Sequence, residues 1–119
     1  MFLWVDDVRP APKGYYWCKS VNETISTIQF IEGSIKAISQ GQLDTDSDKA
    51  VVITDFLKIK GISLDHDAGD YYPNGGDYIK ILDWLEQNKL SYPIQLHTMN
   101  CVGRDNMQRI IDKNGWKVF

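Results

Sequence analysis

Both histidines of the chain lie in polar clusters that follow short apolar runs. His66 lies between Asp65 and Asp67, and His97 follows residues 93–96. A carboxylate beside an imidazole raises the pKa of that imidazole toward the range in which it can exchange protons in catalysis. The pattern therefore indicates His66 and His97 as candidate acid–base residues, with Asp65 and Asp67 as the groups that orient them.

A second acidic pair, Asp6 and Asp7, follows the first apolar run of the chain. Together with Asp65, these carboxylates crowd like charges into a small volume unless a cation neutralises them. Mg²⁺ takes oxygen ligands and often bridges to phosphate, so it is a candidate cofactor with these three residues as its ligands. Arg9 and Arg104 are candidate phosphate ligands, because a guanidinium can bind a phosphate group through two N–H donors.

Each of these residues also has a purely structural interpretation. Aspartates after a strand often form turns or cap helices, and a lone histidine at a strand end is more often structural than catalytic. Arg9 and Arg104 are, in that interpretation, ordinary surface residues. The functional interpretation is favoured because chance rarely places both histidines of a chain in such clusters.

These clusters need a fold that brings them together. Apolar runs ended by polar clusters predict strands, and Ser20 and Glu23 have capping-box spacing ahead of isoleucines at helical intervals. Strands that alternate with helices predict a parallel sheet covered on both faces, a three-layer α/β fold whose ligand site lies beyond the carboxyl ends of the strands. The expected strands are 2–5, 15–18, 51–53, 61–65, 93–97 and 116–119, the expected helices 21–39, 77–88 and 103–113, and 40–50 is an expected loop.

Length and composition limit the classes of protein to be considered. A chain of 119 residues with 43% hydrophobic and 24% charged residues predicts one globular domain over residues 1–119. It has no apolar run near the ~20 residues that span a bilayer, and its net charge of −3 argues against long duplex nucleic acid as a partner. Two cysteines do not make a disulfide scaffold, and we expect a cytoplasmic protein. The four tryptophans are expected in the core.

Three segments carry a resemblance to a known family: LWVDDVRP at 3–10, ISLDHDAG at 62–69 and HTMNCVGRDNM at 97–107. Together they resemble the cyclic-phosphate-processing receiver-like domain family, a divergent relative of response-regulator receiver domains found in bacteria and their phages. The resemblance covers nearly the whole chain except residues 41–60, which look like an insertion. It implies a mostly parallel, five-stranded, flavodoxin-like sheet that lacks the first and last helices.

The resemblance also implies roles for individual residues. Parent receiver domains bind Mg²⁺ through an acidic pair after the first strand, which Asp6 and Asp7 match here. Asp65 matches their phosphoacceptor, Thr98 matches the hydroxyl residue after the fourth strand, and Asn100 in the same motif is expected to join Thr98 in phosphate binding. The chain departs from the parent domains because a proline-rich loop replaces the first helix and no lysine follows the fifth strand.

The leading hypothesis is a phosphoesterase that opens or hydrolyses a cyclic phosphate on a nucleotide or RNA end. One histidine would deprotonate the attacking water and the other would protonate the leaving alkoxide. The alternative is a non-catalytic receiver-like module for signalling or binding, phosphorylated at Asp65. A third class, a metal-dependent nuclease, would need the carboxylates alone. The expected partner is a small phosphorylated ligand, with no membrane involved.

Overall fold

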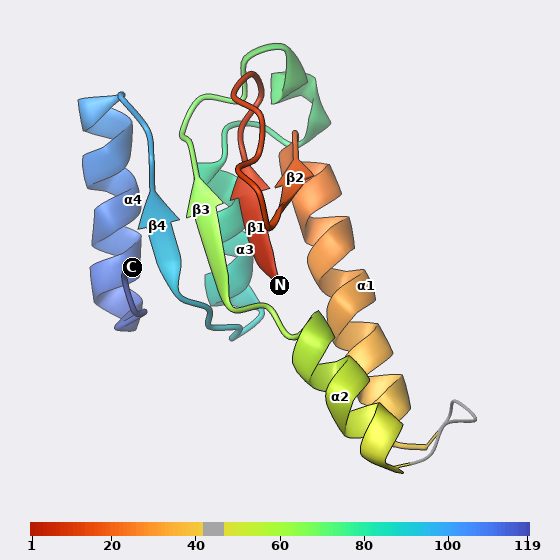
Figure 1. Ribbon diagram of the computed structural model, residues 1–119. Coiled ribbons are helices and arrows are strands. Elements are labelled where there is room, and N and C mark those ends of the chain that lie inside the picture. Colours follow the sequence, from red (N-terminus) through yellow and green to blue (C-terminus); the bar gives the residue numbers. More distant parts are fainter. Residues whose placement is uncertain (42–46) are drawn as a thin grey trace.

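The computed structural model describes residues 1–41 and 47–119, in which strands and helices alternate along the chain (Figure 1). Four strands form one parallel sheet in the order β2-β1-β3-β4, which matches the start of a flavodoxin-like order. The strands are β1 (Phe2–Val5), β2 (Tyr15–Cys18), β3 (Gly61–Leu64) and β4 (Ile94–Leu96). The helices are α1 (Val21–Ser39), α2 (Ser47–Leu57), the 3-10 helix η1 (Gly69–Asn74), α3 (Ile79–Gln87) and α4 (Cys101–Asn114).

The last residues of the four strands lie side by side at one edge of the sheet, because the strands are parallel. Val5 is the register partner of both Cys18 and Leu64, and Leu64 is the partner of Leu96. We call this the carboxyl edge. A side chain that directly follows any of these strands emerges there, as the sequence predicts for the polar clusters.

Helix α1 begins where the capping pattern predicts. The Ser20 hydroxyl accepts a hydrogen bond from the Glu23 N–H at 3.0 Å, and the Glu23 carboxylate accepts one from the Lys19 N–H at 3.2 Å. These bonds satisfy donors that the first helical turn leaves unpaired. Among the described helices, none is both long and apolar enough to cross a membrane.

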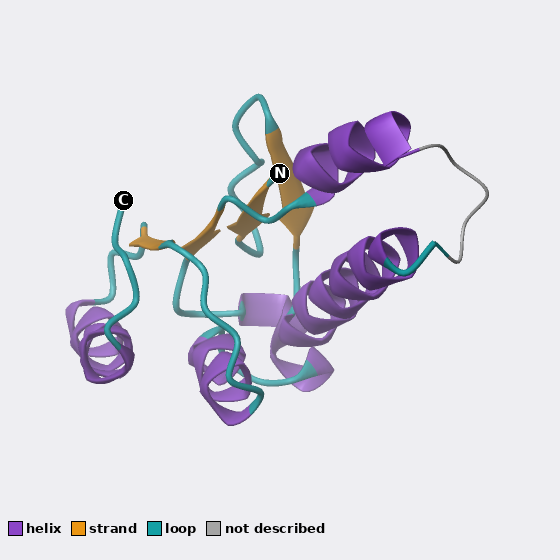
Figure 2. Ribbon diagram, turned by 90° about the horizontal axis from the view of Figure 1, so that it is seen from below, coloured by secondary structure: helices purple, strands orange, loops and turns teal. Residues whose placement is uncertain are grey.

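Three helices, α1, α3 and α4, lie on the same face of the sheet (Figure 2). Along each strand every second side chain points to this face, and all of these side chains except the exposed Tyr16 are almost completely buried. They pack with the apolar stripes of the three helices into one core. The strand residues of this core are Leu3, Val5, Cys18, Ile62, Leu64, Ile94 and Leu96.

The opposite face of the sheet, which we call the open face, has no helix packed over it in the described residues (Figure 2), because α2 lies below the sheet and packs along α1 (Figure 1). The predicted third layer is therefore wrong. Aromatic rings take its place: Phe2 and Trp4 both pack against Tyr15, with ring centroids 5.3 and 5.9 Å apart. Residues 6–14, which join β1 to β2, lie on this side without forming a helix.

The predicted strand at 51–53 is also wrong, because these residues belong to α2. A short apolar run of β-branched residues resembles a buried strand, and periodicity alone does not separate the two. Ala50, Thr54 and Leu57 recur at helical spacing and are the half-buried residues of α2, which packs along α1. The predicted loop at 40–50 is a helix from residue 47, and residues 42–46 lie outside the described part of the chain.

The fifth strand expected at 116–119 is reduced to one isolated parallel bridge between Val118 and Ile94. The described sheet therefore has four strands rather than five. Phe119 still donates its N–H to the Ile94 carbonyl at 3.2 Å, and its ring lies over Gly61 and against Phe2 at the open face.

Candidate active site

Three neighbouring strands deliver polar side chains to the carboxyl edge. The N–H of Asp65 donates to the Val5 carbonyl, and the N–H of His97 donates to the Leu64 carbonyl, both at 2.9 Å. The hydrogen-bond ladder thus extends one residue past β3 and β4. Because side chains alternate along a strand, Asp6, Asp65 and His97 all emerge toward the open face.

Asp6 is the buried centre of this group, with 1% of its side chain exposed. Its Oδ1 accepts the N–H groups of Val8 at 2.9 Å and Arg9 at 2.8 Å. Its Oδ2 lies 2.9 Å from His97 Nε2 and 3.2 Å from Arg9 Nε. Burial alone would raise the pKa of Asp6, but the two backbone N–H donors and His97 lower it overall, so Asp6 is ionised.

Arg9 links two of the carboxylates. Its Nη2 lies 3.5 Å from Asp65 Oδ2, while its Nε is paired with Asp6. The side chain is 48% exposed, so guanidinium N–H donors remain available to solvent at the edge of the site. A cation held between two anchored carboxylates is suited to bind a phosphoryl oxygen.

His97 is held on three sides. Its Nδ1 lies 2.8 Å from the Ser63 hydroxyl, its Nε2 reaches Asp6, and its ring is stacked on the Trp4 indole with centroids 3.8 Å apart. Burial lowers the pKa of His97, and the nearby carboxylate of Asp6 opposes this only in part. Nε2 of His97 donates to the ionised Asp6, and the Ser63 hydroxyl, which donates to Gln95 Oε1 at 3.0 Å, contacts Nδ1.

Asp7 points away from this group, toward the start of η1. Its carboxylate occupies the space that a Cβ atom would need at Gly69, which has a positive φ of +54° and therefore suits glycine. Burial raises the pKa of Asp7, and the charges of Asp6 and Asp65 raise it further.

His66 belongs to a second group at the same edge. Its Nδ1 lies 2.9 Å from Asp67 Oδ1, and its ring packs against Gly103 in the first turn of α4. Asn100 donates through Nδ2 to Asp67 at 3.3 Å, and its Oδ1 accepts the Gly103 N–H as the cap of α4. The hydrogen bond from His66 lowers the pKa of Asp67.

The second ring nitrogen of His66, Nε2, has no hydrogen-bond partner among residues 1–41 and 47–119, and no buried side-chain atom described there is unpaired. Nε2 is therefore in contact with solvent. Asp65 connects the two groups, because its Oδ1 accepts the His66 N–H at 2.8 Å while its Oδ2 faces Arg9.

Two further predicted residues lie at the margin. Thr98 is buried, and its hydroxyl accepts the Asn100 N–H at 3.1 Å, as in a turn before a helix. Arg104 is exposed, and its Nη1 lies 3.5 Å from the Thr98 carbonyl. Their roles in phosphate binding stay predictions.

The described residues contain two groups of side chains that could bind a metal ion. Within each group the ligand atoms lie within 4.8 Å of one another: Asp6 with Asp65 and His97, and His66 with Asp67 and Asp77. A carboxylate offers about four lone-pair sites. Those of Asp6 already face the backbone N–H groups of Val8 and Arg9, the Nε of Arg9 and the Nε2 of His97. This donor set fits a bound guanidinium better than the expected Mg²⁺, so the reaction proposed below uses no metal ion.

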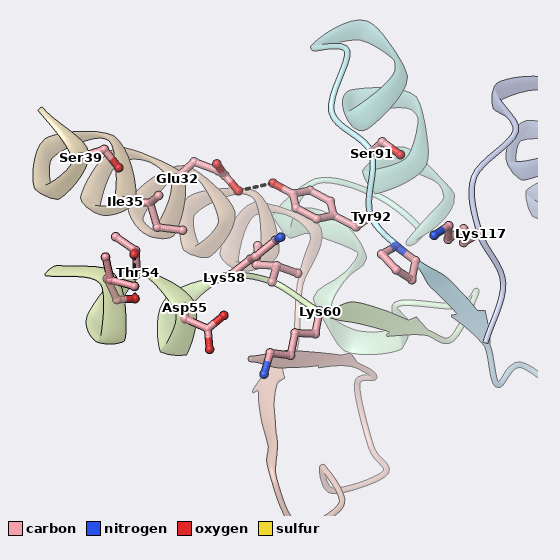
Figure 3. A pocket seen from close by; sticks show the side chains of 13 residues that line it. Glu32, Ile35, Ser39, Thr54, Asp55, Lys58, Lys60, Ser91, Tyr92 and Lys117 are labelled. Carbon is pink, nitrogen blue, oxygen red and sulfur yellow. Dashed lines mark hydrogen bonds between the residues drawn. The ribbon is translucent and has the colours of Figure 1, made fainter. Parts of the chain in front are cut away.

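A large hollow lies elsewhere in the molecule. It encloses about 830 Å³ between α1, α2 and the loops that precede β3 and β4. Figure 3 shows it lined by Glu32, Asp55, Lys58, Tyr92 and Lys117, with the Tyr92 hydroxyl bonded to Glu32 at 2.6 Å. These residues are at the opposite edge of the sheet, so the candidate site is defined by its polar groups rather than by this hollow.

Sequence reasoning missed Trp4 and Ser63, which position His97. Residue type alone indicates a core position for Trp4 and gives no functional signal for Ser63. Strand alternation could have found both, since each lies two residues before an aspartate of the site, Asp6 or Asp65, and therefore on the same face.

The fold and the site define the class of this protein: a small, parallel α/β domain of the receiver type with an acidic centre at the carboxyl edge. The family model described as the cyclic-phosphate processing receiver domain matches residues 1–113. The chain belongs to this family, as the motifs at residues 3–10, 62–69 and 97–107 predicted. No curated protein and no solved structure matches the chain.

Proposed function

We propose that this protein is a phosphoesterase that hydrolyses a cyclic phosphate carried by a nucleotide or an RNA end. The observation that carries this proposal is the environment of His66. Asp67 holds the Nδ1 side of the ring at 2.9 Å and leaves Nε2 open at the carboxyl edge. A carboxylate on Nδ1–H selects the tautomer with a lone pair on Nε2, which is the arrangement of a general base.

The reaction adds water across one phosphorus–oxygen bond. His66 Nε2 accepts a proton as the water oxygen attacks phosphorus, and the bond to one ester oxygen breaks. The alkoxide released by ring opening takes up the proton that His66 gives back, so the product is a phosphomonoester with a free hydroxyl. Proton transfer by a positioned side chain contributes about 10²–10⁴ in rate.

Arg9 and His97 support this reaction in different ways. Arg9 stabilises negative charge on the phosphoryl oxygens, because its guanidinium is held at the edge by Asp6 and Asp65. We assign His97 to positioning, since both of its nitrogens are engaged inside the protein. It fixes Asp6, which in turn fixes Arg9. The two imidazoles are thus not an interchangeable acid–base pair.

An assay of 2′,3′-cyclic and 3′,5′-cyclic nucleotides with His66 and Asp67 variants tests the proposal. His66→Ala should lower kcat by about 10²–10⁴ with little change in KM. Asp67→Asn should lower kcat by less, because Asp67 is 61% exposed. Arg9→Lys should lower kcat and raise KM, since an ammonium lacks the two parallel donors that stabilise charge on the phosphoryl oxygens. Full activity in His66→Ala would defeat the proposal.

Asp65 supports a second candidate, a receiver-like module that accepts a phosphoryl group. Asp65 follows β3 beside Asp6 and Asp7, as the phosphoacceptor does in the parent domains. Against this, Asp65 Oδ2 is paired with Arg9, and its Oδ1 accepts the His66 N–H. Intact mass after incubation with a small phosphodonor and Mg²⁺ decides: a labile phosphate adduct that is absent in Asp65→Asn favours the module.

A further inference from the structure

The open face carries a continuous layer of aromatic rings beside the candidate active site. Phe2, Trp4, Tyr15 and Trp17 alternate out of β1 and β2 and are half-buried. Phe119 adds a ring that is 42% exposed and lies 5.9 Å from Phe2. We call these five residues the aromatic face.

The central strand leaves room for this layer. On the open face β3 contributes only Gly61 and Ser63, and a Cβ atom at Gly61 would collide with the Phe119 ring. Rings from β1 and the C-terminal segment therefore spread over β3. The result is a layer of half-buried rings with Phe119 exposed, on a side of the sheet that carries residues 6–14 but no described helix (Figure 2).

The aromatic face is continuous with the site. The Trp4 indole stacks on His97, and its Nε1 donates to the Arg9 carbonyl at 2.9 Å. Trp17 donates through Nε1 to the Asp6 carbonyl at 2.8 Å. From Phe2 to Asp6 the strand advances about 13 Å at ~3.3 Å per residue. A chain of a few nucleotides with its end at the site would thus lie over the rings.

Cationic groups border the rings. The Lys19 ammonium lies 4.5 Å from the centroid of the Trp17 ring, and Arg9 is exposed at the upper end of the face. At the other end a hollow of about 640 Å³ is lined by Phe2, Tyr15 and Lys60, together with Asp55. Asp55 and Lys60 also line the larger hollow, which carries Lys58 and Lys117 (Figure 3). These local charges suit a phosphodiester backbone despite the net charge of −3.

We propose that the open face binds a single-stranded oligonucleotide whose terminal cyclic phosphate enters the site, so that the substrate is an RNA end rather than a free cyclic nucleotide. This rests on the proposed function for the identity of the reacting group. Bases stack on aromatic side chains with little dependence on sequence, and sheets with exposed aromatic rings bind single-stranded RNA in this way. The occupant is a nucleic acid because the rings are bordered by cations and continuous with the phosphate-binding arginine.

Binding, measured without turnover, tests this inference. The probe is a labelled seven-residue oligoribonucleotide with a 3′-phosphate, followed by fluorescence anisotropy at two salt concentrations, with the 3′-mononucleotide and a duplex as competitors. The wild type should prefer the single strand by at least about tenfold. Tyr15→Val should weaken binding about tenfold and Tyr15→Phe should retain it, because only the ring is needed. Lys60→Gln should reduce the salt dependence of the affinity for the oligonucleotide. Phe30→Leu on α1 and Lys80→Gln on α3 are controls that should leave this affinity unchanged.

Equal affinity for the oligonucleotide and the mononucleotide would overturn the inference. The inference would also fail if the aromatic face bound a second copy of the chain. In that case Tyr15→Val would lower the molar mass measured by light scattering and leave oligonucleotide binding intact. Circular dichroism confirms that the variants are folded. Oligonucleotide binding without hydrolysis defeats the proposed function alone, and hydrolysis of mononucleotides without oligonucleotide preference defeats this inference alone.

Discussion

The indole ring of Trp4 lies parallel to the imidazole ring of His97, with centroids 3.8 Å apart and 1° between the ring planes. The two residues come from β1 and from the end of β4, and Ser63 of the intervening strand β3 is small enough to let the rings meet. The stack fixes the orientation of His97 and aims Nε2 at Asp6. A half-buried strand residue, Trp4, thus helps to set the position of the ion pairs at the carboxyl edge.

Acidification should lower the stability of the protein through His97. Its folded pKa is below the ordinary value of 6.5 because of burial. As pH falls through about 6.5 the unfolded chain binds a proton that the folded chain does not, so the free energy of unfolding decreases. Urea unfolding between pH 5 and 8 measures this slope. His97→Gln should flatten it, and an unchanged slope in this variant would contradict the assignment.

Asp7→Asn should stabilise the protein at pH 7. The folded pKa of Asp7 is raised, first by burial and then by Asp6 and Asp65. Ionised Asp7 therefore destabilises the folded state at pH values above that folded pKa. Removing the charge should raise the free energy of unfolding by about 0.5–1 kcal/mol after allowance for solvent screening. The gain should shrink below pH 4, where Asp7 is protonated. Asp70→Asn, on the exposed start of η1, is the control, and an equal gain there would contradict the explanation.

Gly103→Ala should disable the site, whereas Gly33→Ala should stabilise the protein. A Cβ atom at Gly103 would overlap the His66 ring, 2.8 Å from Nδ1. The ring must then move from Asp67, so we expect lower kcat and a loss of 1–3 kcal/mol, about the cost of overpacking. At Gly33, inside α1, nothing lies within 4 Å, and alanine should gain about 0.5–1 kcal/mol. Unfolding curves and kcat for both variants check this, and an active Gly103→Ala would be contrary evidence.

Ser63→Ala should cost about 1–3 kcal/mol of stability, because His97 Nδ1 and Gln95 Oε1 both lose their hydrogen-bond partner, the buried Ser63 hydroxyl. The same change should alter the ¹⁵N chemical shifts of the His97 ring and leave those of His66 as they are. Ser34→Ala in α1 serves as the control. Identical His97 shifts in Ser63→Ala would mean that the hydroxyl does not hold the ring.

Local chemistry made part of this fold predictable. Ser20 and the isoleucines of α1 set the bounds of a helix, and the apolar runs before Asp6, Asp65 and His97 marked strands that end at one edge. The family motifs follow from the same residues. The run Val51–Ile53 could not be placed, because three apolar β-branched residues suit a strand and a helix equally until packing against α1 decides.

The sequence patterns could not predict how the residues of the site are arranged around the sheet. Two histidines in polar strand-end clusters predicted one shared catalytic pair, but strand alternation and the start of α4 give the two rings different partners. His97 joins Trp4 and Ser63, whereas His66 joins Asp67 and packs on Gly103. The absence of a third layer was equally hidden, since half-buried aromatic residues in a strand look the same whether a helix or solvent faces them.

The most direct test of the account is ³¹P NMR of a 2′,3′-cyclic phosphate on a short oligoribonucleotide, incubated with the protein in EDTA. The account predicts that the cyclic diester signal gives way to a phosphomonoester with wild-type protein, and that His66→Ala slows this by about 10²-fold or more. A diester that persists with wild-type protein, or one that disappears equally fast with His66→Ala, would contradict it.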